Sequence, residues 1–200
     1  MTILVLKSPP TQNFPVIKSP PKSKSCIYLY FIPPPQPADA IPKIAALTMA
    51  CVIGTQIGSD GAKLLIEVFD SHPKLQSLCG ISPGSTTVDL SKSNMGPADC
   101  LILTHELQAG RATAAVNSLT LDSNGIFGEL YPSGNVKQAD KFVVEVQPLL
   151  DALKTSSITS LSLRSTGMGV KGVVAVADAI RAMASVASLT ISGATTLITR

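Results

Sequence analysis

The residues of this chain best suited to chemistry are three glycines that follow a short apolar stretch. In GMGVKG, Gly167, Gly169 and Gly172 have the spacing GxGxxG. In dinucleotide-binding enzymes that spacing joins a strand to a helix, and backbone N–H groups hold a pyrophosphate. Here three residues separate Leu163, the last strand position, from the glycines, and no acidic residue follows Asp178 to hold a ribose. A dinucleotide site through Gly167–Gly172 is therefore the lesser alternative, and we expect no cofactor.

Other side chains capable of catalysis or metal binding are scattered along the chain. The two histidines, His72 and His105, each have one polar neighbour, Ser71 and Glu106 respectively, and we expect both to be solvated. A catalytic triad would need a nucleophile and an acid to converge on one of them, which the sequence does not indicate. The cysteines are spaced without any CxxC, so we expect no zinc site and no disulfide framework, only small fillers in a reducing compartment: Cys26, Cys51, Cys79 and Cys100.

Composition and charge argue against several classes of protein. The net charge of +3 over 200 residues, with 14% charged residues, gives no basis for nucleic-acid binding. No apolar run approaches the length that spans a bilayer, about 20 residues, so we expect no membrane span. The expectation is a non-enzymatic cytoplasmic protein.

Residues 1–46 are rich in proline. Ten of the fifteen prolines lie in the first 42 residues, with KSPP at 7–10 and 18–21 and PPPQP at 33–37. Proline removes backbone donors and disfavours helix before it, so this segment is predicted to be a disordered tail or the product of an over-long gene model. Two alternatives stay open. Lysines without an acid before Asp39 weakly indicate organelle import, and PPPQP is typical of ligands for proline-recognition domains.

From residue 47 onward one pattern repeats. VNSLTLDSNGI, residues 116–126, fits LxxLxLxxNxL, with Asn124 at the asparagine position. LTMACVIGTQI, TTVDLSKSNM and ITSLSLRSTGM repeat it with Thr55, Ser93 and Thr166 at that position, and KLQSLCG and VASLTISGA are shorter copies. The asparagine position lies in the turn after the strand, where a polar side chain can satisfy free backbone groups.

The copies recur at a regular interval. Their last strand residues are 52, 80, 90, 121, 163 and 191, which gives spacings of 28, 10, 31, 42 and 28. The spacing of 42 indicates a 14-residue insertion near 128–141, and the spacing of 10 indicates a copy without its helix. After three copies, apolar residues four apart fall on one helical face: Leu65 and Phe69, Leu103 and Leu107, Val176 and Ile180.

On these motifs residues 47–200 resemble a leucine-rich repeat array of the ribonuclease-inhibitor-like type, as found in NOD-like receptors and the Ran GTPase-activating protein. The resemblance implies an α/β solenoid of about five to six strand units, with parallel strands on the concave face and helices on the convex face. It also implies a protein-binding scaffold without catalysis. A fragment of a larger receptor-like or GTPase-activating regulatory protein is the alternative, with further repeats of the same polypeptide beside it.

Residues that alternate with the buried strand positions face the concave side of such an array. We expect this face to bind a protein partner or, alternatively, to be merely hydrated. Asp122 and Arg164 come from adjacent copies and are expected to pair or to offer a polar spot. The predicted partner-binding residues are Asp89, Ser91, Thr120, Asp122, Ser162, Arg164 and Thr190.

Overall fold

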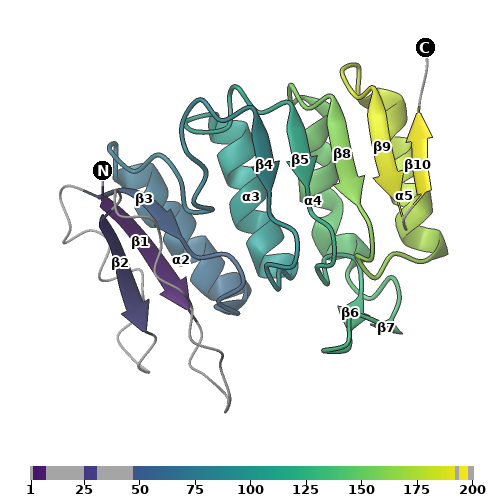
Figure 1. The fold of residues 1–200 in the computed structure, drawn as a ribbon, viewed down its shortest axis with the longest axis horizontal. Coiled ribbons are helices and arrows are strands. Elements are labelled where there is room, and N and C mark those ends of the chain that lie inside the picture. The colour runs from purple at the N-terminus through teal and green to yellow at the C-terminus, as the bar shows by residue number, and fades with distance from the viewer. Residues whose placement is uncertain (1, 8–24, 31–46, 192–193, 198–200) are drawn as a thin grey trace.

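The computed structural model describes residues 2–7, 25–30, 47–191 and 194–197 (Figure 1). Strands and helices are interleaved along these ranges, and the protein is α/β. The helices are α2 (Gly58–Ser71), α3 (Pro97–Ala109), α4 (Val143–Lys154) and α5 (Val170–Ala182). The strands are β1 (Thr2–Lys7), β2 (Ser25–Tyr30), β3 (Leu47–Cys51), β4 (Thr87–Asp89), β5 (Ser118–Thr120), β6 (Glu129–Leu130), β7 (Val136–Gln138), β8 (Ser160–Leu163), β9 (Ser188–Ile191) and β10 (Ala194–Leu197).

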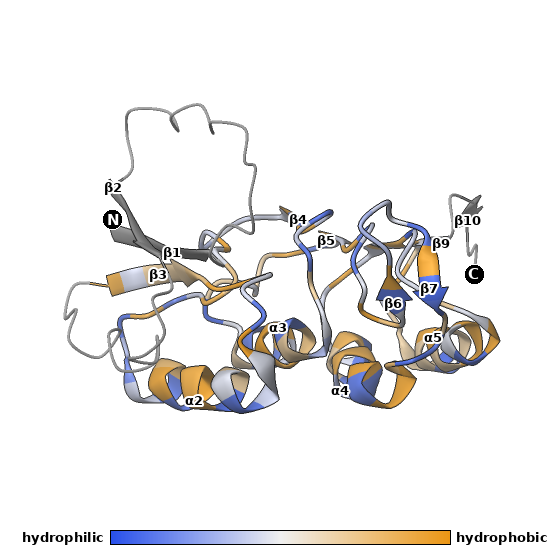
Figure 2. Ribbon diagram, turned by 90° about the horizontal axis from the view of Figure 1, so that it is seen from below, coloured by the Kyte–Doolittle hydropathy of each residue, from blue (hydrophilic) through white to orange (hydrophobic). Residues whose placement is uncertain are grey.

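The largest sheet has five strands in the order β10-β9-β8-β5-β4. β4, β5, β8 and β9 are parallel, and β10 pairs antiparallel with β9. Parallel neighbours need a crossover connection, and α3, α4 and α5 supply the three crossovers. Helices α2 to α5 lie side by side on one face of the strands, as the two views show (Figures 1 and 2). None of the helices in the described residues lies on the opposite face.

The core lies between the strands and the helices, where the repeat pattern predicts it. The paired leucines of β5 and β8 are buried, with Leu119 and Leu161 each 1% exposed. On the helices, Leu65 and Leu103 are 0% exposed and Val176 is 1% exposed. The second helical position is fully buried only at Phe69, whereas Leu107 and Ile180 are partly buried against the same core. The four-residue spacing thus identified the inward helical face.

The turns that follow the strands share one backbone conformation. A positive φ occurs two residues after the last strand anchor in each of four turns, at Gly54 (73°), Lys92 (53°), Ser123 (57°) and Ser165 (51°). The left-handed region is unfavourable for residues with a Cβ, by roughly 1–2 kcal/mol each. This conformation recurs at the same position in four turns, three times in a residue other than glycine, so these four turns share one geometry.

The N-terminal segment differs in part from the prediction of a disordered tail over residues 1–46. Two six-residue strands lie within it, β1 and β2, and they form a parallel sheet with β3 in the order β2-β1-β3. Both strands are proline-free runs of apolar and β-branched or aromatic residues, which favour strands. The KSPP repeats and PPPQP lie almost wholly outside the described residues.

Two irregular segments interrupt the regular alternation. Between α2 and β4 the chain forms no second helix; it pairs with β3 through Ala50 N–H to the Ser77 carbonyl at 2.8 Å and turns at Ser82–Ser85. Between β5 and α4 the predicted insertion is a hairpin, in which β6 pairs antiparallel with β7. Both irregularities fall where the spacings of 10 and 42 residues indicate them.

Candidate binding surface

The helix-free face of the five-stranded sheet, called the open face below, carries the residues predicted to meet a partner: Asp89, Ser91, Thr120, Asp122, Ser162, Arg164 and Thr190. Asp89 and Arg164 are exposed, and Ser91, Thr120, Asp122 and Ser162 are half-buried. Alternation along β5 and β8 places these side chains opposite the buried leucines. Six of the seven are therefore accessible from one side of the sheet.

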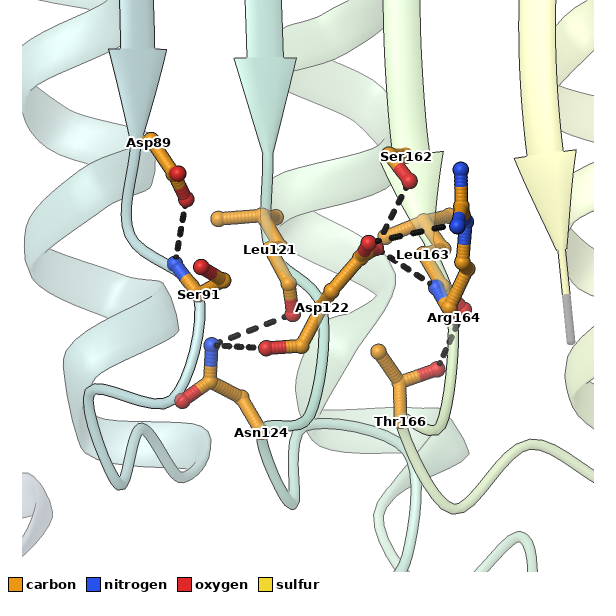
Figure 3. A network of polar contacts seen from close by, with 9 residues as sticks. All are labelled: Asp89, Ser91, Leu121, Asp122, Asn124, Ser162, Leu163, Arg164 and Thr166. Atoms are coloured by element: carbon orange, nitrogen blue, oxygen red, sulfur yellow. Dashed lines mark hydrogen bonds and ion pairs between the residues drawn. The ribbon is translucent and has the colours of Figure 1, made fainter. Parts of the chain in front are cut away.

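A polar network joins two neighbouring strand ends on the open face (Figure 3). Asp122 accepts hydrogen bonds at Oδ1 from the Ser162 hydroxyl at 2.7 Å and from the Arg164 backbone N–H at 2.8 Å. Its Oδ2 lies 3.7 Å from Nε of Arg164. The expected pairing of Asp122 with Arg164 is present.

Asp89 presents a second carboxylate on the same face. The Ser91 backbone N–H donates to Asp89 Oδ1 at 2.9 Å. The Ser91 hydroxyl and then this N–H lower the pKa of Asp89, so the side chain stays charged at neutral pH. The open face therefore offers an exposed acid and an exposed arginine on non-adjacent strands.

Thr190 departs from the predicted surface. It is 7% exposed. β10, a strand that the repeat pattern did not include, pairs with β9 and places Thr195 opposite Thr190. Adding a strand turns the expected edge of the sheet into an interior position, so Thr190 is not an accessible contact.

The side chains at the asparagine positions, Thr55, Ser93, Asn124 and Thr166, bond to backbone groups in the turns, but they differ in the number and length of these bonds. Thr55 and Thr166 donate from their hydroxyls to the carbonyls of their own strands' last buried residues, at 2.7 and 3.1 Å. Ser93 makes only a 3.4 Å bond to the Ser91 carbonyl. Asn124, 1% exposed, is the one member of the four that also bonds to a neighbouring turn.

Asn124 uses both ends of its amide. Oδ1 accepts from the Met95 N–H at 3.0 Å, and Nδ2 donates to the carbonyls of Leu90 and Leu121 at 2.8 and 3.0 Å. A fourth, longer bond joins Nδ2 to the Asp122 carbonyl at 3.3 Å. This side chain therefore fastens the turn after β4 to the turn after β5.

The GMGVKG motif is occupied by the protein itself. Asp140, which follows the hairpin, accepts hydrogen bonds from the N–H groups of Gly169, Gly172 and Lys171 at 2.7, 2.8 and 2.9 Å. Burial alone would raise the pKa of Asp140, but these three N–H donors outweigh it and lower the pKa. The amides that a pyrophosphate would need at the start of α5 already hold a carboxylate.

The first glycine of the motif has a packing role. Gly167 has φ +76° and lies against the backbone of Gly128, so an added Cβ would be 2.6 Å from the Gly128 Cα. This close approach brings the turn after β8 against the hairpin. The motif is accounted for by turn packing and by the capping of α5.

Two buried acids were not singled out from the sequence as structural elements. Glu106, 2% exposed on α3, accepts bonds from the Ser77 hydroxyl and from the N–H groups of Leu78 and Cys79. Asp99, 3% exposed, accepts from the N–H groups of Gly54 and Gly96 at 2.8 and 2.9 Å. Burial raises the pKa of both carboxyl groups against the opposing effect of these donors. Both acids satisfy backbone N–H groups in turns and at a helix start.

The histidines lie in the helix layer. Nε2 of His105 lies 2.7 Å from Asp70 Oδ1, and the His105 ring packs edge-on against the Phe69 ring. His105 is therefore more constrained than the solvated side chain that the sequence predicts. His72 ends α2. Arg111, which sequence reasoning did not single out, stacks over the Phe69 ring and donates to carbonyls at the end of α2. These contacts join helices and turns to one another.

A hollow of about 890 Å³ opens beside the hairpin. Its walls include Met95, Pro97, Leu130, Tyr131 and Phe142. Glu129 lies at this hollow and bonds to Lys137 and Lys141, each at 2.6 Å. These two contacts lower the pKa of Glu129 to about 2. The hairpin is thereby held by an exposed ion-pair network.

Within the described ranges no helix combines the length and the apolarity needed to cross a bilayer. In the same part of the chain, no three His, Cys, Asp or Glu side chains are grouped so as to hold a metal ion. Scans of the sequence against protein-family models and against curated proteins give no match.

Proposed function

We propose that residues 47–200 form a leucine-rich repeat solenoid of the ribonuclease-inhibitor-like type and serve as a non-catalytic, protein-binding scaffold. Contacts between copies support the repeat proposal because they recur at the sequence interval. Met95 and Asn124 bond across 29 residues, and Asp122 and Ser162 across 40, where the hairpin lengthens the interval. The shared positive-φ turn gives independent support.

One observation carries the functional proposal: the Asp122–Ser162–Arg164 network lies on a sheet face that none of the helices α2 to α5 covers (Figures 2 and 3). On the proposed solenoid this open face is the concave surface. Asp89 and Arg164 are its exposed charged residues, and Asp122 and small hydroxyl side chains lie between them. A partner with charges arranged to complement this pair would be oriented by them, since complementary charge sets register and association rate.

The proposal of a scaffold without catalysis is supported by what the reactive groups already do. Asp140, Asp99 and Glu106 hold backbone N–H groups, and His105 is bonded to Asp70. Catalysis needs a base within reach of a nucleophile. Each of these groups instead has a structural partner in the fold.

Site-specific photocrosslinking tests the face. A benzophenone amino acid at Thr120 on the open face should form an adduct with the partner, whereas the same residue at Glu145, exposed on α4, should not. Adducts from Glu145 alone would contradict the proposal. The crosslinked protein is then purified for a binding measurement with the unmodified chain.

A charge reversal then tests the network. Asp122→Arg with Arg164→Asp should weaken partner binding about tenfold or more, since central contacts are each worth more than about 1 kcal/mol. The matched control is Asp151→Arg with Lys154→Asp, an exposed pair on α4 with a 2.6 Å contact. Arg164→Ala, which keeps the backbone bond to Asp122, separates loss of contact from loss of folding. Equal affinity across all variants would refute the role of the open face.

A further inference from the structure

Two cysteines lie opposite each other where β3 meets the segment that follows α2. Cys51, the last residue of β3, forms an isolated antiparallel bridge with Cys79. The Val52 N–H donates to the Leu78 carbonyl at 2.8 Å, one residue after Cys51 and one before Cys79. This places the cysteines at a non-hydrogen-bonded pair, where Cα atoms are about 4.5 Å apart and side chains lie close together. Disulfides span Cα separations of about 4.4–6.8 Å.

The neighbouring glycine brings the chain onto the first thiol. Gly80 has φ +75°, a left-handed conformation in which the backbone turns back over Cys51. An added Cβ at Gly80 would lie 3.1 Å from Cys51 Cβ and 3.3 Å from its Sγ. The Cys51 side chain therefore rests on the residue next to Cys79.

The two thiols differ in access. Cys51 is half-buried, and Cys79 is 3% exposed. Burial, followed by the Glu106 charge and the neighbouring Cys51, raises the pKa of Cys79. An oxidant from solution therefore meets Cys51 first, and Cys79 is placed to react second.

We propose that Cys51 and Cys79 close a reversible disulfide by exchange with glutathione disulfide. The Cys51 thiolate attacks one sulfur, the S–S bond breaks, and one glutathione leaves with the proton that Cys51 gave up. Cys79 then loses its proton and attacks the Cys51 sulfur of the mixed disulfide, and the second glutathione leaves with that proton. Two protein thiols are oxidised and one glutathione disulfide is reduced to two glutathiones. The bond would join β3 covalently to the turn held by Glu106.

Peptide mapping tests the proposal on the full chain. Cleavage after lysine and arginine places the four cysteines in four separate peptides, residues 25–43, 44–63, 75–92 and 93–111. The protein is equilibrated in glutathione buffers of increasing oxidised fraction, quenched with acid, alkylated and digested without reduction. The expected result is loss of free 44–63 and 75–92 together, and gain of one linked peptide joining them.

Variants distinguish the native pairing from chance oxidation. Cys79→Ser should stop the reaction at a glutathione adduct on 44–63, and Cys100→Ser should leave the linked peptide unchanged, because Cys100 is buried on α3. Urea should abolish the preference and scatter the links among all four cysteines. Three outcomes overturn the proposal: glutathione adducts without a link, links through residue 26 or between chains, or the same link pattern in urea.

Discussion

Replacing Asn124 by alanine should be among the most damaging single changes in the turns. The substitution removes three close hydrogen bonds, to Met95, Leu90 and Leu121, and leaves a buried N–H and two carbonyls without that partner. Each lost bond to a buried group costs about 1 kcal/mol or somewhat more. We therefore expect the free energy of unfolding to fall by about 3–5 kcal/mol. Thr166→Ala removes one bond, to the Leu163 carbonyl, and should cost about 1 kcal/mol.

The assay is urea unfolding followed by far-ultraviolet circular dichroism, because the chain has no tryptophan. Asn124→Thr is the informative intermediate. Its hydroxyl can still reach the Leu121 carbonyl, as Thr166 reaches its own strand, but the bonds to Met95 and Leu90 are lost. Asn124→Thr should lower the free energy of unfolding by about 2 kcal/mol. This variant keeps the test valid if Asn124→Ala does not fold. Equal losses for Asn124→Ala and Thr166→Ala would refute the reasoning, since they would show that bonding between turns adds nothing.

Three further changes follow from the buried and capping groups. Glu106→Gln should stay within about 1 kcal/mol of the native chain while Glu106→Ala loses about 3, because alanine leaves buried N–H donors unpaired. Folding raises the pKa of Glu106 above its unfolded value of about 4.3. The native chain should therefore lose stability relative to Glu106→Gln as the pH rises from the unfolded pKa through the folded pKa. Parallel curves of stability against pH for the two proteins would contradict this. Asp140→Ala should cost about 1–2 kcal/mol through the lost cap of α5. The pKa of Asp140 is lowered in the folded protein. Its contribution to stability should therefore be present above the unfolded pKa of about 3.9 and vanish as the pH falls through the folded pKa. Denaturant unfolding of the native chain and of Asp140→Ala at pH 7 and pH 2 measures this. Gly167→Ala should cost about 3 kcal/mol from strain and collision with Gly128, whereas Gly134→Ala, with open space around it, should cost only about 1; similar shifts in melting temperature would contradict the packing argument.

The layers of the fold could be predicted because burial sets a strict period on the sequence. Leu119 and Leu121, like Leu161 and Leu163, alternate along their strands, and all four are nearly inaccessible. Leu65 and Phe69 lie one helical turn apart and are both buried. Apolar spacing of this kind indicates which side of a strand or helix faces the core.

Elements that lack this period were harder to recognise. No helix was assigned over Val143–Lys154, where α4 contains Pro148, a residue that usually ends helices. Pro148 is the sixth residue of α4 and removes one hydrogen bond of the helix, and the packing of the buried Val146, Leu149, Leu150 and Leu153 offsets this loss. β10 was also missed, because a short polar strand that pairs with an edge has no burial pattern. Thr190 was misplaced for that reason.

The candidate surface could be predicted only in outline. Strand alternation identified Asp122 and Arg164 on one face, and their spacing of 42 residues indicated neighbouring copies. The roles of Asp140, Asp99 and Glu106 depend on turns from distant parts of the chain, for which the sequence carries no local signal. Their acidity and their positions near turn glycines would have been the available clue.

The hairpin shows that added length can become indispensable to the elements around it. Surface insertions are usually tolerated and removable, since extra loop residues cost little. Removing residues 128–141 would also remove Asp140, which accepts hydrogen bonds from the first turn of α5, and Gly128, which contacts Gly167. A shortened chain would then need a new acceptor for those amides, so trimming this protein to a uniform repeat length would require redesign of the following copy.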